Sequence, residues 1–378
     1  MTRRFREHDV RQVTPLDGIW DFAFLGDVDP DTIDVSAIAF GDRMAVPGCF
    51  DATPAYAGQR GLTAYRTRLL FTDEALYRLV FDSVHHWCRI FVEGKPLGDH
   101  AGGFTQFTMD IVNHPVGEAT LVVLVDNRMD YARCPLHLEY FDWYHFGGIS
   151  RSVALHRMGD VWIDGLRIET EDIAARQIGV TVNYGATIVR GATPLTLTFD
   201  GQKILADAVD IVSPSGQKRY ILHLPAAALW SPDAPNLHTL HVRLGDDDAR
   251  ERFGIRQVRV EGQAILVNGE PVRLLGVNRH EAHPQFGHAL PDGLLVADVQ
   301  QLRDLGCNFV RGSHYPQDAR FLDLCDEAGL MVWCEATAWQ QTAEHLTDPH
   351  YLSAQETNIL EMVAVAANHP SVIMWGIQ

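Results

Sequence analysis

The sequence of 378 residues lacks features that would point to a membrane, a nucleic acid or a paired-cysteine motif. It has no apolar run near the roughly 20 residues that a membrane-spanning helix needs. It has no CxxC pair and no excess of basic residues, with 31 Lys and Arg against 49 Asp and Glu and a net charge of −18. Phosphate groups are bound by basic surfaces, so this balance argues against nucleic acid and anionic membranes as partners. We expect a soluble protein.

The cysteines and the N-terminus predict the compartment. The 6 cysteines are scattered along the chain, which is typical of buried free thiols in a reducing cytoplasm. The basic start, residues 1–9, has no apolar segment after it, so we expect no signal peptide. The sequence therefore predicts a cytoplasmic protein. Its length and its apolar fraction of 46 % favour two or three globular domains.

Two successive stretches have the pattern of β-sandwiches. From residue 16 to about 157 the segments are short, rich in β-branched and aromatic residues, and separated by Gly, Pro and Asp. The alternating pattern continues from residue 161 to about 256. Strands at this spacing are typical of all-β domains. We predict one sandwich over residues 1–160 and a second, of immunoglobulin-like size, over residues 161–257.

After residue 257, strands and helices alternate. The predicted strands are 273–278, 307–311, 330–335 and 371–378, and the predicted helices are 294–305, 318–328 and 352–367. Nearly continuous apolar strands joined by helices imply a parallel sheet. Four such strands are about half of those in an eight-stranded barrel. The sequence thus predicts the first half of a (β/α)8 TIM barrel over residues 258–378.

Four separated sequence motifs resemble those of glycoside hydrolase family 2, the family of β-galactosidase and β-glucuronidase. They are LDGIWDF (16–22), DWYHFGGISRSV (142–153), GVNRHE (276–281) with VRGSHYP (310–316), and NHPSVIMW (368–375). The resemblance covers nearly the whole chain. It implies a sugar-binding, jelly-roll-like first sandwich, an immunoglobulin-like second sandwich and a barrel that carries the active site.

The resemblance implies three substrate-binding residues, Asp142, His280 and His314. In the family, the Asp that matches Asp142 reaches the barrel mouth and accepts hydrogen bonds from sugar hydroxyls. The matching histidines contact the glycon and stabilise an oxocarbenium-like transition state. By residue type alone, such an Asp is more often a turn cap and such a His a structural hydrogen-bonding group.

Three further residues are candidates for supporting roles. Arg311 is expected to orient a catalytic carboxylate, and Asn278 is either a site residue or a strand-end cap. Glu335 follows a strand and is either a site carboxylate or the partner of an Arg on a neighbouring strand. The ion pair is the simpler interpretation.

We predict no metal site and no cofactor. His280 and His283 are three residues apart, which does not match the HExxH zinc motif. The resemblance suggests a sodium ion at Asp142 and a magnesium ion after the third barrel strand. However, Trp339 stands where the acidic magnesium ligand would be. The residues present therefore do not favour either ion.

The family's reaction is retaining glycoside hydrolysis by two Glu residues about 5–5.5 Å apart. Its acid/base would lie two positions past Gln378 and its nucleophile further on, and Glu281 and Glu335 match neither role. We therefore expect no catalytic residue within residues 1–378, and we expect these residues alone to be inactive. The chain is predicted to be part of an exo-acting β-glycosidase that forms a homo-oligomer.

The sequence around His280 and His283 resembles β-galactosidases more than β-glucuronidases. We therefore expect a β-galactoside as the substrate, with a β-glucuronide as the alternative and a β-mannoside as the third choice. A second hypothesis is a non-catalytic carbohydrate-binding protein that stacks sugars on Trp87, Trp143 and Tyr144, although sandwich core is the commoner place for such aromatics. A third is a metal-dependent barrel hydrolase using His280 and His283.

Overall fold

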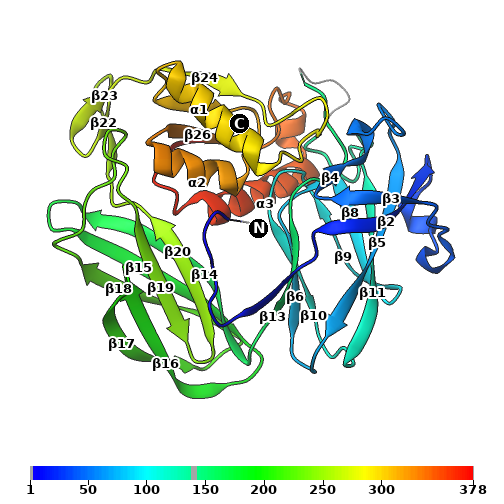
Figure 1. The fold of residues 1–378 in the computed structure, drawn as a ribbon, viewed down its shortest axis with the longest axis horizontal. Coiled ribbons are helices and arrows are strands. Elements are labelled where there is room, and N and C mark those ends of the chain that lie inside the picture. The colour runs from blue at the N-terminus through cyan, green and yellow to red at the C-terminus, as the bar shows by residue number, and fades with distance from the viewer. Residues whose placement is uncertain (1–2, 138–142, 378) are drawn as a thin grey trace.

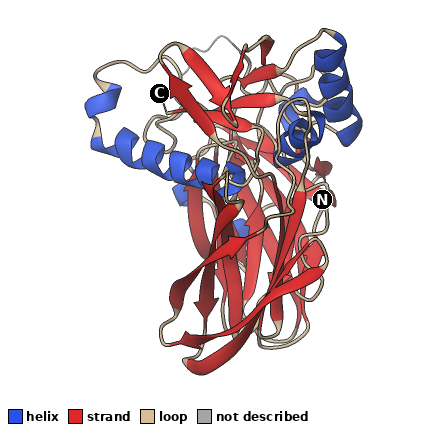
Figure 2. Cartoon of the chain, turned by 90° about the vertical axis from the view of Figure 1, so that its left-hand side faces the viewer, coloured by secondary structure: helices blue, strands red, loops and turns tan. Residues whose placement is uncertain are grey.

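The computed structural model describes residues 3–137 and 143–377. Two β-sheet regions stand side by side, and an α/β region lies across one end of both (Figure 1). Seen from the side, the α-helices gather at that end, and most of the rest of the molecule is strands and loops (Figure 2). In the part of the chain that is described, no helix is long and apolar enough to cross a membrane.

The first region is a sandwich of two antiparallel sheets, with the strand orders β1-β13-β6-β10 and β3-β2-β5-β11-β8-β9, and a short third sheet β4-β12-β7. Its core is the layer of apolar side chains between the two larger sheets, including Phe22, Tyr65 and Phe81. The strands are β1 (Gln12–Pro15), β2 (Gly18–Gly26), β3 (Asp42–Val46), β4 (Gly48–Cys49), β5 (Leu62–Phe71), β6 (Tyr77–Phe81), β7 (Val84–His85), β8 (Trp87–Val92), β9 (Lys95–Ala101), β10 (Phe107–Ile111), β11 (Gly117–Asp126), β12 (Gly148–Ile149) and β13 (Val153–Arg157).

The second region is also a sandwich, with the strand orders β14-β15-β18 and β17-β16-β19-β20. Alternating residues of β15, β16 and β19 meet between the sheets, including Val180, Leu197 and Val242, all buried. The strands are β14 (Val161–Asp172), β15 (Gln177–Ala186), β16 (Arg190–Phe199), β17 (Gln202–Ile211), β18 (Ser215–His223), β19 (His238–Leu244) and β20 (Asp247–Phe253).

The third region opens with a small antiparallel sheet of β21 (Val258–Glu261), β22 (Ala264–Val267) and β23 (Glu270–Val272). A parallel sheet follows in the order β24-β25-β26-β27. Its elements are β24 (Gly276–Arg279), α1 (Asp292–Asp304), β25 (Phe309–Gly312), α2 (Ala319–Ala328), β26 (Met331–Glu335), α3 (Pro349–Ala366) and β27 (Val372–Gly376). The strand order is the chain order, as in a barrel.

Local signals set the helix ends in this region. The Asp318 side chain accepts a hydrogen bond from the backbone N–H of Arg320 and begins α2. Gly329, at a φ of 70°, ends α2 in the left-handed conformation. The Asp348 side chain caps α3 in the same way as Asp318 caps α2. Each helix can therefore be placed from the sequence to within a few residues.

The multidomain β architecture with a TIM-barrel portion agrees with the prediction. Strand β24 starts at Gly276 rather than at residue 273, because the N–H of Leu275 donates to the Asn308 side chain instead of a neighbouring strand. The sheet of β21–β23 was not anticipated, because its segments are too short to show a period. The boundaries at residues 160 and 257 stay predictions.

Candidate functional site

Polar side chains from three neighbouring parallel strands meet at one edge of the sheet β24–β27. His280 follows β24, Arg311 and His314 lie at and after the end of β25, and Glu335 is the last residue of β26. These are the carboxyl ends of the strands, where barrel active sites form. We call His280, Arg311, His314 and Glu335 the strand-end cluster.

Glu335 is the electrostatic centre of this cluster, with 0 % of the residue exposed. Its Oε1 lies 2.5 Å from Arg311 Nε and its Oε2 lies 3.1 Å from Arg311 Nη2. His314 Nδ1 is 3.2 Å from Glu335 Oε2. The same Nδ1 lies 3.1 Å from Arg311 Nη2, so a protonated Nδ1 donates to Glu335 and an unprotonated Nδ1 accepts from Arg311. Glu335 thus fixes both the Arg311 fork and the orientation of the His314 ring.

Aromatic rings from two regions of the protein surround the cluster. Trp339 stacks on His314 with ring centroids 4.3 Å apart and an interplanar angle of 14°. Trp143, from the loop before β12 of the first sandwich, has its centroid 5.2 Å from that of His280 and 5.1 Å from that of His314. A ring nitrogen of the exposed His280 lies 3.5 Å from the hydroxyl of Tyr315. The cluster therefore combines polar groups with aromatic faces.

A buried ion network holds the first sandwich against the barrel strands. Arg151, just after β12, places Nη2 2.8 Å from Glu281 Oε1 and Nε 3.6 Å from Asp318 Oδ2. Arg279 Nη1 lies 3.3 Å from the other oxygen of Glu281. The N–H of Asp318 also donates to Glu281, over 2.8 Å. Glu281 therefore joins the loops after β24 and β25 to the sandwich that carries Trp143.

Two family descriptions match the chain: "Glycosyl hydrolases family 2" over residues 161–256 and "Glycosyl hydrolases family 2, TIM barrel domain" over residues 258–378. The chain belongs to glycosyl hydrolase family 2. It is 31 % identical over 313 residues to a β-galactosidase of Thermoanaerobacter pseudethanolicus, covering 79 % of this chain and 41 % of that protein. It spans less than half the length of that relative.

Solved structures of the family superpose on nearly the whole chain. A family 2 β-galacturonidase from Eisenbergiella tayi bound to galacturonate gives a TM-score of 0.90 at 30 % identity, covering 99 % of this chain and 66 % of that one. A β-glucuronidase from Bifidobacterium dentium complexed with coumarin-3-O-glucuronide gives a TM-score of 0.86 at 27 % identity, covering 98 % of this chain and 68 % of that one. The three regions are therefore arranged as in known family 2 enzymes.

In this family 2 chain, the structure brings four of the six candidate residues together, namely His280, His314, Arg311 and Glu335. Asn278 is exposed on β24, opposite Arg311 in the sheet register. Asp142 lies outside the described residues, beside the described Trp143.

The three aromatic candidates end in different surroundings. Trp87 is buried in the core of the first sandwich, which is the commoner place for such an aromatic residue. Tyr144 is exposed, and its hydroxyl donates to Asp51. Trp143 is the one of the three that lies against the strand-end cluster, beside His280 and His314. Sequence reasoning gave no role to Arg151, although Arg151 stands in the GISRSV phrase that carried part of the resemblance.

The residues at the magnesium position of the family do not fit that ion. Trp339 offers an indole, which is stacked on His314 and carries no oxygen ligand. His283 is engaged locally, because its Nδ1 accepts a hydrogen bond from the N–H of Gln285 over 3.2 Å. Neither His280 nor His283 belongs to the ligand-like groups found among the described residues.

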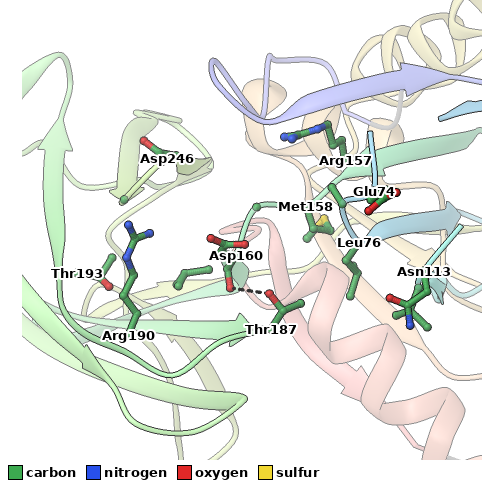
Figure 3. Close-up of a pocket in the computed structure, with 15 residues that line it drawn as sticks. Glu74, Leu76, Asn113, Arg157, Met158, Asp160, Thr187, Arg190, Thr193 and Asp246 are labelled. Carbon is green, nitrogen blue, oxygen red and sulfur yellow. Dashed lines mark hydrogen bonds between the residues drawn. The ribbon is translucent and has the colours of Figure 1, made fainter. Parts of the chain in front are cut away.

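Two crevices among the described residues lie away from the strand-end cluster. A pocket of about 410 Å³ opens between the two sandwiches, with Arg157 and Arg190 on opposite walls and a hydrogen bond from Thr187 to Asp160 across its floor (Figure 3). A second, of about 600 Å³, lies between all three regions. Neither is lined by His280, His314 or Glu335.

Buried His288, behind the cluster, predicts a pH-dependent stability. Its Nδ1 lies 2.6 Å from the carbonyl of Glu281, and burial lowers its pKa from 6.5 to about 4. The unfolded chain therefore binds a proton near pH 6.5 that the folded chain does not bind until about pH 4. The stability that neutral His288 contributes to the folded state is fully present above pH 6.5. It is lost as the pH falls from 6.5 to about 4.

We expect wild type to lose roughly 3 kcal/mol more unfolding free energy than His288→Gln between pH 7 and pH 4. Urea unfolding at both pH values measures the difference. His350→Gln, at an exposed position, is the matched control and should follow wild type. Equal pH dependence in wild type and His288→Gln would show that His288 is not held neutral.

Proposed function

We propose that this chain is part of a retaining, exo-acting β-glycosidase whose terminal sugar binds at the strand-end cluster. The observation that carries the proposal is the meeting of Trp143 from the first sandwich with His280 and His314 from the barrel strands. Imidazole groups can hydrogen-bond the hydroxyls of a sugar, and an indole can pack against its apolar face. We also propose that the two sandwiches are jelly-roll-like and immunoglobulin-like.

The cluster supports substrate binding, not the bond-breaking step itself. Retaining hydrolysis needs one carboxyl group that protonates the leaving oxygen and a second that attacks the anomeric carbon. Glu335 is occupied by Arg311 and His314, and Glu281 by Arg151 and Arg279. Both are placed to hold other side chains. We therefore propose that residues 1–378 alone do not hydrolyse glycosides.

The charge balance of the cluster favours a neutral sugar. A uronide carries a carboxylate, which is best bound by an arginine fork or another cation. Arg311, the arginine of the cluster, already has its fork on Glu335. We therefore place a β-galactoside first, in agreement with the β-galactosidase relative. A β-uronide is the second candidate, favoured by the galacturonidase and glucuronidase structures.

A panel of nitrophenyl β-D-glycosides tests this assignment in the complete gene product. We expect kcat/KM for the galactoside to exceed the values for the glucuronide, the galacturonide and the mannoside by at least about tenfold, because one unmatched polar group costs that much or more. A faster uronide would make the protein a β-uronidase. Binding of galactose without turnover of any member would favour the non-catalytic alternative. The cytoplasmic location and the homo-oligomer remain expectations.

A further inference from the structure

Three histidines from separate segments converge inside the first sandwich. His86 lies between β7 and β8, and His137 and His145 lie on either side of residues 138–142. One ring nitrogen from each lies within 4.8 Å of those from the other two. The ring centroids of His86 and His137 are 4.2 Å apart, and those of His86 and His145 are 5.2 Å apart. All three side chains are buried.

His86 is the unusual member of this group. It is 0 % exposed, and neither of its ring nitrogens has a hydrogen-bond partner among the residues that the structure describes. A neutral imidazole has one N–H and one lone pair, and burying a polar atom without a partner costs free energy. A metal ion bound to one ring nitrogen would satisfy a lone pair that the protein leaves unused.

The ionisation and the chemistry of the group suit a transition metal. Burial lowers the pKa of all three rings, that of His137 to about 3, so the imidazoles are neutral at physiological pH and ready to bind. Three imidazoles without a carboxylate in the group favour zinc, copper or nickel over magnesium or calcium. Three histidines with a fourth position open are a common zinc ligand set.

We propose that His86, His137 and His145 form a binding site for a divalent transition metal ion of the zinc type in the first sandwich. The site is separate from the strand-end cluster but linked to it. Trp143 stands two residues before His145, with ring centroids 5.0 Å apart, and its ring also lies against those of His280 and His314. A bound ion would fix the segment that carries Trp143, and hence one wall of the proposed sugar site.

Zinc content and affinity of the complete gene product test the site without reference to glycoside hydrolysis. After loading with Zn²⁺ and dialysis, we expect about one zinc per chain in wild type. His86→Gln and His145→Gln should each weaken Zn²⁺ binding by at least about tenfold in competition with a chromophoric chelator. His238→Gln is the control, because His238 is also buried but bonds Asp200 and a backbone carbonyl in the second sandwich. It should retain the zinc of wild type.

Wild type alone provides a second readout if the variants do not fold. Bound Co²⁺ should show the intense visible bands of a tetrahedral site, and Zn²⁺ should raise the Tm of the metal-free protein as a ligand of the folded state does. The proposal is overturned if wild type retains no more zinc than His86→Gln. It is equally overturned if neither the Co²⁺ spectrum nor the Tm responds. Either result leaves the glycosidase assignment standing, because the readouts do not involve a sugar.

Discussion

Glu335→Gln is expected to lower kcat/KM for an aryl β-glycoside about 100-fold in the complete gene product, because misplaced binding groups cost that much. The carboxylate takes two hydrogen bonds from Arg311 and lies 3.2 Å from His314 Nδ1. An amide cannot accept the Arg311 fork with both atoms, so Arg311 loses its partner and the His314 ring loses its orientation. Breaking such a pair also costs stability, roughly 3 kcal/mol for a buried one.

The control for Glu335→Gln is Glu118→Gln, which removes the partner of Arg68 on the exposed face of β5 and β11. An exposed pair contributes about 0–1 kcal/mol, so this variant should keep the activity and stability of wild type. Because Glu335 acts through its neighbours, the effect should include a rise in KM as well as a fall in kcat. Full activity of a folded Glu335→Gln would mean that the Arg311–Glu335 pair does not organise the site.

Arg151→Met should have the largest effect on stability, a loss of about 3–5 kcal/mol. The substitution keeps much of the volume but leaves the buried carboxylates of Glu281 and Asp318 without this cation. Two carbonyls, those of Phe104 and Pro316, lose their donor as well. Equilibrium unfolding in guanidinium chloride measures the loss.

A double variant separates the charge effect from packing. Adding Glu281→Gln to Arg151→Met removes one of the two buried carboxylates that lost Arg151 as a partner. We expect this second substitution to restore part of the lost stability. Arg68→Met, on the exposed pair with Glu118, should change stability by less than about 1 kcal/mol. A loss below that limit in Arg151→Met itself would contradict the role of Arg151 as the link between the sandwich and the barrel strands.

Much of the α/β region could be predicted because its signals are local. The strand at Met331–Glu335 is almost continuously apolar, and α2 has a capping Asp318 and a terminal Gly329. Once the strands are known to be parallel, residues that follow them must meet at one edge. His280, His314 and Glu335 each stand at or just after the end of a predicted strand, so their nearness in the structure follows from the parallel sheet.

What the sequence did not reveal depends on contacts between distant segments. Arg151 is 130 residues from Glu281, and nothing local in either segment predicts that they pair. His86 lies far in sequence from His137 and His145, and no metal-ligand spacing connects them. A tryptophan such as Trp143 is more often a core residue than a binding residue. Its place beside His280 follows from the packing of the sandwich against the barrel strands.

The most direct test of the account is the equilibrium binding of a non-hydrolysable β-thiogalactoside to the complete gene product, measured by calorimetry for wild type, Trp143→Ala and Tyr144→Phe. Tyr144 is the matched control, since its hydroxyl contacts Asp51 and not the cluster. The account predicts saturable binding in wild type and in Tyr144→Phe, and at least about tenfold weaker binding in Trp143→Ala, as expected for the loss of an aromatic anchor. Equal affinity in all three proteins, or no saturable binding in wild type, would contradict it.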